Sequence, residues 1–201
     1  MLALFFEVLP KAGHEDDYFR HVGMLKPALA KHTGMLWLDR FKSLSRDNLI
    51  LSHQLWADEA AIVGWREDDL HKGSQHAGRY KHFADYRIRI AEIFVRIDGT
   101  KPPQHFEPGS QANGGFMVAA HSEGEALSGF DESFASVNID GAFVGLADAA
   151  NEQEALQRLE QVRRQSRFTW GFAARMTRDY GMFERDEAPQ DYPPVDFGRG
   201  A

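Results

Sequence analysis

The spacing of hydrophobic residues changes along this chain, from the two-residue period of a strand to the longer period of a helix and back. Residues 2–10 are a short apolar run, which predicts a buried strand. Residues 14–32 carry acids at their start and bases at their end, as a helix dipole prefers. We expect Pro27 to kink or split this helix, and Gly34 to end it. Its expected core stripe consists of Tyr18, Val22, Leu25 and Leu29.

The next segments predict a hairpin, a helix and a further strand. Residues 35–44 and 48–57 are strand-like and flank a short polar turn. Asp58 is a good helix cap, and we expect the helix behind it to run to Phe83 with a weak point at Gly73. The alternating residues 86–97 predict a half-exposed strand. The order β-α-β-β-α-β is that of a ferredoxin-like unit.

The second half of the chain repeats part of this order. Residues 130–162 have the same strand, turn, strand and helix build as residues 34–65, at a period of roughly 95 residues. The glycine-rich segment after His121 has few apolar residues, so we expect the first helix of this copy to be shortened or lost. The expected strands are 115–120, 132–138, 142–147 and 168–183, and the expected helix is 151–165.

The predicted fold class is therefore α+β, with two ferredoxin-like repeats of the dimeric α/β-barrel type. We place a first domain at 1–97, a linker at 98–114, a degenerate second repeat at 115–185 and a surface-packed tail at 186–201. A single ferredoxin-like unit leaves one sheet face uncovered. We expect the two repeats to cover each other as an internal pseudo-dimer, and a further homodimer stays open.

Composition and charge narrow the class of protein. A net charge of −7 argues against a nucleic-acid partner, because phosphate binding needs basic patches. No apolar run approaches the length of a membrane span, and the N-terminal apolar stretch meets Glu7, so we expect a strand there rather than a signal peptide. The absence of cysteine excludes disulfides and thiolate ligands and fits a cytoplasmic protein.

An ordered set of residues in the first half resembles the antibiotic biosynthesis monooxygenase superfamily. These residues are Phe19, Leu25-Lys26-Pro27, Gly34, Phe41-Lys42-Ser43-Leu44, Ser52-His53, Trp56, Trp65-Arg66, His71, Gln75, Gly78-Arg79 and Tyr86. The second half looks like a degraded copy, strongest at Phe134–Val137 and at Arg178-Asp179-Tyr180.

The resemblance implies a small dimeric α+β barrel protein with a cavity between sheet and helices. Oxygenases of the superfamily oxidise aromatic polyketides with O2 and use neither metal nor flavin. The haem-degrading branch uses a helix histidine, a Trp and an Asn. Trp65 and His76 match the first two of these positions, but the Phe6-Glu7 region has no Asn.

We single out three candidate catalytic residues. Trp65 and His76 are eleven residues apart, which would place them on one face of a regular helix, as a pocket wall with an imidazole or as packing with a rim histidine. His53 alternates with Leu51 and Leu55, so it should point inward, into a core or a pocket.

The candidate substrate-binding residues are Glu7, His71, Tyr86 and Arg87. Glu7 would act as a base if buried alone, or would pair with Arg87 or Arg89 across the sheet. His71 and Gln75 are an i, i+4 pair, suited to a solvated surface or to a hydrogen-bonding clamp. Tyr86 and the two arginines would hold an acidic or phenolic ligand, or form a charged edge.

The sequence shows no metal-binding spacing, since His71 and His76 are five residues apart rather than four. The predicted function is a cofactor-independent monooxygenase with a small aromatic or acidic substrate. The alternatives are a non-catalytic ligand-binding or assembly protein of the same fold, and a haem-binding or haem-degrading protein.

Overall fold

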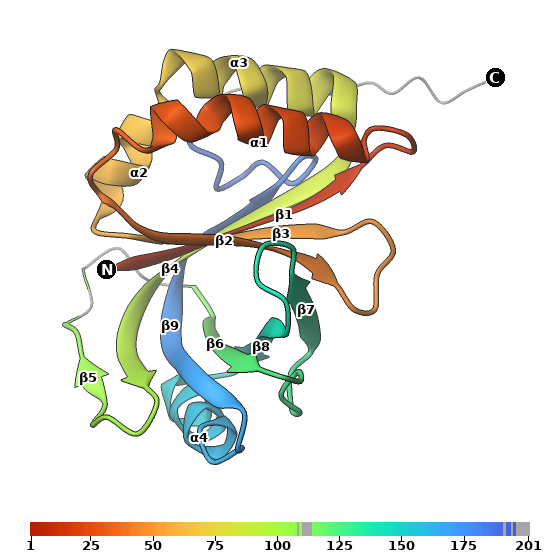
Figure 1. Ribbon diagram of the computed structural model, residues 1–201. Helices are drawn as coiled ribbons and strands as arrows, with labels where there is room; N and C mark the ends of the chain where they lie inside the picture. The colour runs from red at the N-terminus through yellow and green to blue at the C-terminus, as the bar shows by residue number, and fades with distance from the viewer. Residues whose placement is uncertain (108, 110–113, 191, 194, 196–201) are drawn as a thin grey trace.

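The computed structural model describes residues 1–107, 109, 114–190, 192, 193 and 195, and its strands form one closed barrel (Figure 1). Eight antiparallel strands follow each other around the barrel in the order β1, β3, β2, β7, β8, β6, β9 and β4. The pairing of β4 with β1 closes the ring, and the short strand β5 extends the sheet outside it on β4. The fold is α+β, as predicted.

The first half supplies one side of the barrel. Its elements are β1 (Leu2–Pro10), α1 (Glu15–Leu29), β2 (Met35–Ser43), β3 (Ile50–Trp56), α2 (Glu59–Arg66), α3 (Asp69–Ala77), the π-helical turn η1 (Gly78–His82) and β4 (Phe83–Asp98). The second half supplies the other side, with β5 (Gln104–His105) before it. Its elements are β6 (Phe116–Glu123), β7 (Glu132–Ser136), β8 (Ala142–Ala149), α4 (Glu152–Val162) and β9 (Phe168–Gly181).

The two halves have the same strand order, which confirms the predicted repeat. The strands run β2-β3-β1-β4 in the first half and β7-β8-β6-β9 in the second. Equivalent strands meet at both seams, because β2 pairs with β7 and β4 pairs with β9. The helices α2 and α4 also begin alike: Asp58 accepts a hydrogen bond from the Ala61 amide, and Asn151 accepts one from the Glu154 amide. No helix joins β6 to β7 in this described segment, so the predicted loss is confirmed.

The barrel interior is packed by side chains from both halves. Strand alternation turns every second residue inward, and the largest of these inward apolar residues are fully buried. They include Phe5, Phe41, Leu51, Met117, Phe134 and Phe172. Neither half contains enough of this core to fill the interior alone, so each half covers the open sheet face of the other.

Helices cover the outside of the barrel on two opposite sides (Figure 1). The helices α1, α2 and α3 lie over the first half and bury Trp56, Trp65 and Tyr18 against the sheet. The helix α4 lies over the second half and buries Leu159 and Val162. Among the described residues, no helix is long and apolar enough to cross a membrane.

The prediction of one long helix from Asp58 to Phe83 is wrong. The chain forms three pieces, and the break falls at Glu67 and Asp68 rather than at Gly73. The physical reason is Asp68, which has an extended backbone and accepts hydrogen bonds from the Leu70 and His71 amides, so it caps a new helix. Pro27 does not split α1 either, since it lies in the last turn, two residues before the end of the helix.

The chain after β9 returns to the first half, as far as it is described. The Tyr192 hydroxyl lies 3.2 Å from Gln75 Oε1, and the Pro193 carbonyl accepts a hydrogen bond from Arg79. This agrees with the predicted surface-packed tail. Residues 191, 194 and 196–201 of the tail and residues 108 and 110–113 of the linker lie outside the described residues, and the proposed domain boundaries remain a prediction.

Candidate functional site

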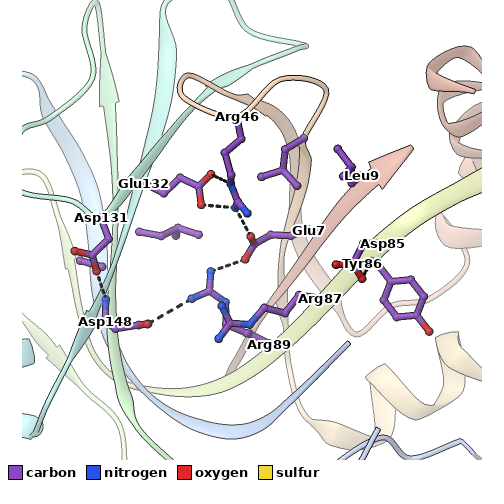
Figure 2. Close-up of a pocket in the computed structure, with 13 residues that line it drawn as sticks. Glu7, Leu9, Arg46, Asp85, Tyr86, Arg87, Arg89, Asp131, Glu132 and Asp148 are labelled. Atoms are coloured by element: carbon purple, nitrogen blue, oxygen red, sulfur yellow. Dashed lines mark hydrogen bonds and ion pairs between the residues drawn. The ribbon is translucent and has the colours of Figure 1, made fainter. Parts of the chain in front are cut away.

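A cavity of about 340 Å³ opens at one end of the barrel, between the two halves (Figure 2). Its walls come from β1 and β4, the turn before β3, and β7 and β8. The apolar part consists of Leu9, Leu49, Leu146 and Ala147, and the polar part of arginines and carboxylates. We refer to this space as the barrel-mouth cavity.

The floor of the barrel-mouth cavity is a buried ion pair between Glu7 and Arg89. Glu7 is directly opposite Arg87 in the β1–β4 ladder, yet its carboxylate accepts a 2.6 Å hydrogen bond from the diagonal neighbour Arg89. Both side chains of this pair are less than a tenth exposed. The predicted pairing of Glu7 across the sheet is therefore confirmed for Arg89, whereas Arg87 pairs with Asp179 of β9.

A second guanidinium reaches the same carboxylate from the hairpin turn between β2 and β3. Arg46 donates to the other oxygen of Glu7 at 2.8 Å and forms a two-nitrogen contact with Glu132 of β7. This contact links the first half to the second. In Figure 2, dashed lines join Arg46 to Glu7 and Glu7 to Arg89. They also join the two ends of this row of side chains to further acids, Glu132 beside Arg46 and Asp148 beside Arg89.

The contact between Arg89 and Asp148, at one end of this row, is weak. Asp148 of β8 lies 3.4 Å from Arg89 Nη1, and its side chain is 64% exposed. The Nε atom of Arg89 is buried and has no hydrogen-bond partner among the described residues. Arg89 therefore has donor capacity that its partners do not use fully.

Asp85 lies at the edge of the cavity, and partial burial raises the pKa of its carboxyl group. A backbone hydrogen bond from Tyr86 opposes this rise. The Tyr86 side chain itself points to the helix-covered face, where its hydroxyl accepts hydrogen bonds from Arg79 and Arg185 (Figure 2). Of the expected substrate-binding residues, Glu7 and Arg87 present their side chains at the cavity, Tyr86 lies in the cavity wall with its side chain turned away, and His71 is not among the lining residues.

Beneath the floor, aromatic rings fill the barrel. Phe5 stacks on His53 with a centroid distance of 4.5 Å, and the Arg89 guanidinium carbon lies 5.8 Å from the centre of the Phe5 ring. His53 in turn stacks on His121, which stacks on Trp170 at 3.7 Å. His53 points inward, as predicted, but it is not among the residues that line the barrel-mouth cavity. Its Nδ1 lies 3.2 Å from His121 Nε2, so one imidazole of each half meets at the centre.

Burial keeps both of these histidines neutral. Burial lowers the pKa of His53 to about 3, with a smaller contribution from Arg96. Burial and the neighbouring His53 lower the pKa of His121 well below its usual value. The His53 Nε2 atom has no hydrogen-bond partner among the described residues. A proton on Nδ1, donated to His121, leaves only a lone pair at Nε2 and is the less costly tautomer.

The structure does not bring Trp65 and His76 together. Because the helix breaks at Asp68, the imidazole of His71 stacks on Trp65, with the ring centroids 4.2 Å apart. His76 packs against Tyr80 instead. His71 Nδ1 also lies 2.8 Å from the Trp65 carbonyl oxygen and 3.1 Å from Gln75. Trp65 and His71 thus form a packed unit between helix and sheet. The His71 ring therefore occupies the space beside Trp65 that the resemblance assigned to a haem ligated near His76.

Several cavity residues had no signal in the sequence. Arg46 stands in a polar turn, where a charged residue is ordinary, and Glu132 and Asp148 stand in the degenerate second repeat. Only the inward register of β7 and β8 distinguishes these two acids, and that register depends on how the halves pair.

Comparison with known proteins matches the first part of this chain to a known family. Residues 1–77 match the model of the antibiotic biosynthesis monooxygenase family. A protein of Pyricularia oryzae named jasmonate monooxygenase ABM is 27% identical over 214 residues, which cover 97% of this chain and all of that protein.

One solved structure supports the fold at low sequence identity, and a second matches in coverage alone. An aldoxime dehydratase superposes with a TM-score of 0.53 at 7% identity, over 87% of this chain and 80% of that one. An anthrone oxidase-like protein gives a TM-score of 0.40 at 12% identity, over 94% of this chain and 96% of that one. The family match of residues 1–77 and the relative at 27% identity thus agree with the resemblance of the first half to the antibiotic biosynthesis monooxygenase superfamily.

Proposed function

We propose that this protein is a monooxygenase that oxidises a small organic acid in the barrel-mouth cavity, with O2 and without a metal or organic cofactor. The observation that carries the proposal is the buried Arg89 guanidinium, which faces a cavity of about 340 Å³ with spare donor capacity. That volume suits a small molecule. The related fungal protein is named for an organic acid anion and for the same reaction class.

Asp148 marks the place of the substrate carboxylate. Its contact with Arg89 is long and its side chain is mostly exposed, so a ligand carboxylate displaces it at little cost. Glu7 stays in place because two guanidiniums hold it. The apolar body of the substrate then lies against Leu9, Leu49 and Leu146.

Asp85 is the proposed proton acceptor. It lies at the cavity edge, and its raised pKa makes it a better base than an ordinary aspartate. It removes a proton from an acidic CH2 group of the substrate, and the carbanion transfers electrons to O2. A carbon–oxygen bond forms, and loss of water leaves a carbonyl group. One O2 is consumed for each CH2 converted to C=O, so no external reductant is needed.

Ligand binding without oxidation is the second candidate function. One observation favours it: the space behind the cavity floor is filled by Phe5, His53, His121 and Trp170. A substrate therefore reaches none of the buried histidines. This candidate predicts saturable binding of an organic acid with no oxygen uptake.

Oxygen uptake tests the proposal directly. We expect wild-type protein to consume one O2 per substrate oxidised for at least one member of a panel of small organic acids, with jasmonate first. Asp85→Asn should lower kcat by about 100-fold or more and leave KM almost unchanged, as loss of a general base does. Arg164→Asn, an exposed change on the surface beside α4, is the control and should keep full activity. Binding without oxygen uptake across the panel would support the second candidate instead.

A further inference from the structure

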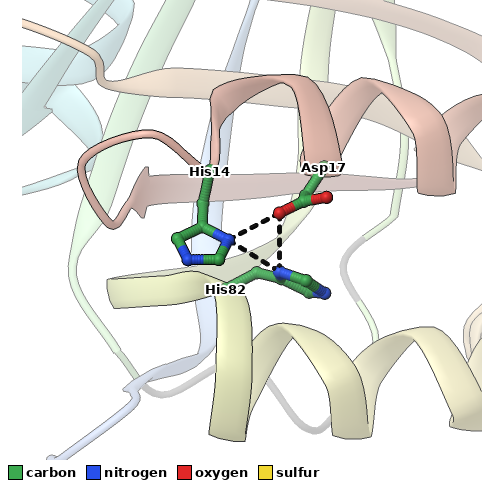
Figure 3. A group of neighbouring side chains, drawn as sticks. All are labelled: His14, Asp17 and His82. Atoms are coloured by element: carbon green, nitrogen blue, oxygen red, sulfur yellow. Dashed lines mark hydrogen bonds and ion pairs between the residues drawn. The ribbon is translucent and has the colours of Figure 1, made fainter.

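Three side chains converge on the helix-covered side of the first half, outside the barrel-mouth cavity (Figure 3). His14 directly precedes α1, Asp17 lies in its first turn, and His82 ends η1 just before β4. The β1–β4 pairing brings these elements together, and the Lys11 amide donates a 2.8 Å hydrogen bond to the His82 carbonyl. The spacing along the chain gives no hint of this cluster, because His14 and His82 are 68 residues apart.

The three facing atoms have the separations of metal ligands. His14 Nδ1 lies 2.5 Å from Asp17 Oδ2, and His82 Nδ1 lies 3.0 Å from both of these atoms. Ligands at about 2.0–2.1 Å from one ion are about 3.0 Å apart at neighbouring octahedral positions and about 3.4 Å apart in a tetrahedron. The triangle is therefore close to one face of an octahedral site.

We propose that His14, Asp17 and His82 bind a divalent first-row transition metal ion such as Zn²⁺ or Fe²⁺. Two imidazole nitrogens and one carboxylate oxygen suit these ions, whereas Ca²⁺ and Mg²⁺ prefer oxygen ligands. Each neutral imidazole can place at most one proton inside the triangle, so hydrogen bonds satisfy at most two of its three contacts. A cation instead accepts a lone pair from each of the three atoms.

The surroundings hold the ligands in place. Arg20 pairs with the second oxygen of Asp17, which fixes the orientation of the carboxylate. The His82 side chain is 6% exposed and that of Asp17 15%, while His14 is 32% exposed and leaves the site open to water on one side. His21 lies beside His82, but its Nδ1 lies 2.9 Å from the Ser74 hydroxyl. The bound ion would join the start of α1 to the η1–β4 junction.

Calorimetric titration of metal-free, full-length protein with Zn²⁺ tests the site, and Co²⁺ absorbance in the visible range reports the ligand field. We expect one ion per chain and a rise in Tm on binding. His14→Ala and Asp17→Asn should each weaken binding by at least about tenfold, since even an outer-shell partner contributes about 10–100-fold. The matched control is His105→Ala, an exposed histidine on β5, which should bind as wild type does.

The proposal does not depend on the proposed function, because binding is measured without substrate. His14 is partly exposed, so His14→Ala should stay folded, which circular dichroism checks. The site is refuted if no saturable 1:1 binding occurs, or if His14→Ala and Asp17→Asn bind as tightly as His105→Ala.

Discussion

Replacing Glu7 with leucine is expected to lower the free energy of unfolding by about 3–5 kcal/mol. The carboxylate of Glu7 holds two guanidiniums, and Arg89 is almost fully buried. Without Glu7, the 3.4 Å contact with Asp148 is the one ion pair left to Arg89 among the described residues, beside its position over the Phe5 ring. An uncompensated buried charge is among the most costly defects in a folded protein. Urea denaturation of the two proteins measures the difference.

A matched ion pair, made by an arginine on the same strand as Arg89, serves as the control. Arg87 and Asp179 form an ion pair of the same kind, but their side chains are 47% and 34% exposed. Arg87→Ala should therefore cost less than about 1 kcal/mol. The double variant Glu7→Leu with Arg89→Met should recover most of the loss, because an apolar pair leaves no buried charge. If the double variant is less stable than Glu7→Leu alone, the buried charge is not the cause.

Acid is expected to destabilise the barrel through its central histidines. The pKa of His53 is about 3 in the folded protein and about 6.5 in the unfolded chain. Below pH 6.5 the unfolded chain therefore binds a proton that the folded protein does not. The contribution to stability is complete above pH 6.5 and is lost as the pH falls toward 3. His121 acts in the same direction.

The expected size is about 1.4 kcal/mol per pH unit for each such histidine, or about 2.5 kcal/mol between pH 6.5 and pH 4.5. The measurement is the free energy of unfolding against pH for wild type and for His53→Leu. In this range, the slope of the His53→Leu variant should correspond to about one proton fewer bound on unfolding than in wild type. His105→Leu, a change at an exposed residue, should keep the wild-type slope. Equal slopes in wild type and His53→Leu would show that His53 is charged in the folded protein.

The sequence predicts the barrel well because local patterns define most of its parts. Strand alternation and the Asp58 and Asn151 caps recur in both halves, and the structure has the predicted strand order. The helix after Asp58 shows the limit of that approach. The change of direction at Asp68 depends on a single cap, which looks like any surface aspartate in the sequence.

The candidate site was less predictable, because it is made by pairing between distant strands. Glu7 and its partner Arg89 were accessible to sequence reasoning, since both lie on strands of one sheet. Glu132 and Asp148 became wall residues only when β7 joined β2 and closed the barrel. The hypothesis that Trp65 and His76 share one face was wrong because it assumed a continuous helix, and the local cap at Asp68 breaks that helix.

The central claim is that Arg89 receives an acidic ligand in the place of Asp148. The most direct measurement is calorimetric titration of jasmonate into wild type, Asp148→Ala and Arg46→Glu, with Arg164→Glu as a control for net charge. We expect Asp148→Ala to bind more tightly and Arg46→Glu to bind about 10–100-fold more weakly, because a new carboxylate in the cavity wall repels the ligand carboxylate. Arg164→Glu should match wild type. Weaker binding by Asp148→Ala, or equal affinity in all four proteins, would contradict the account.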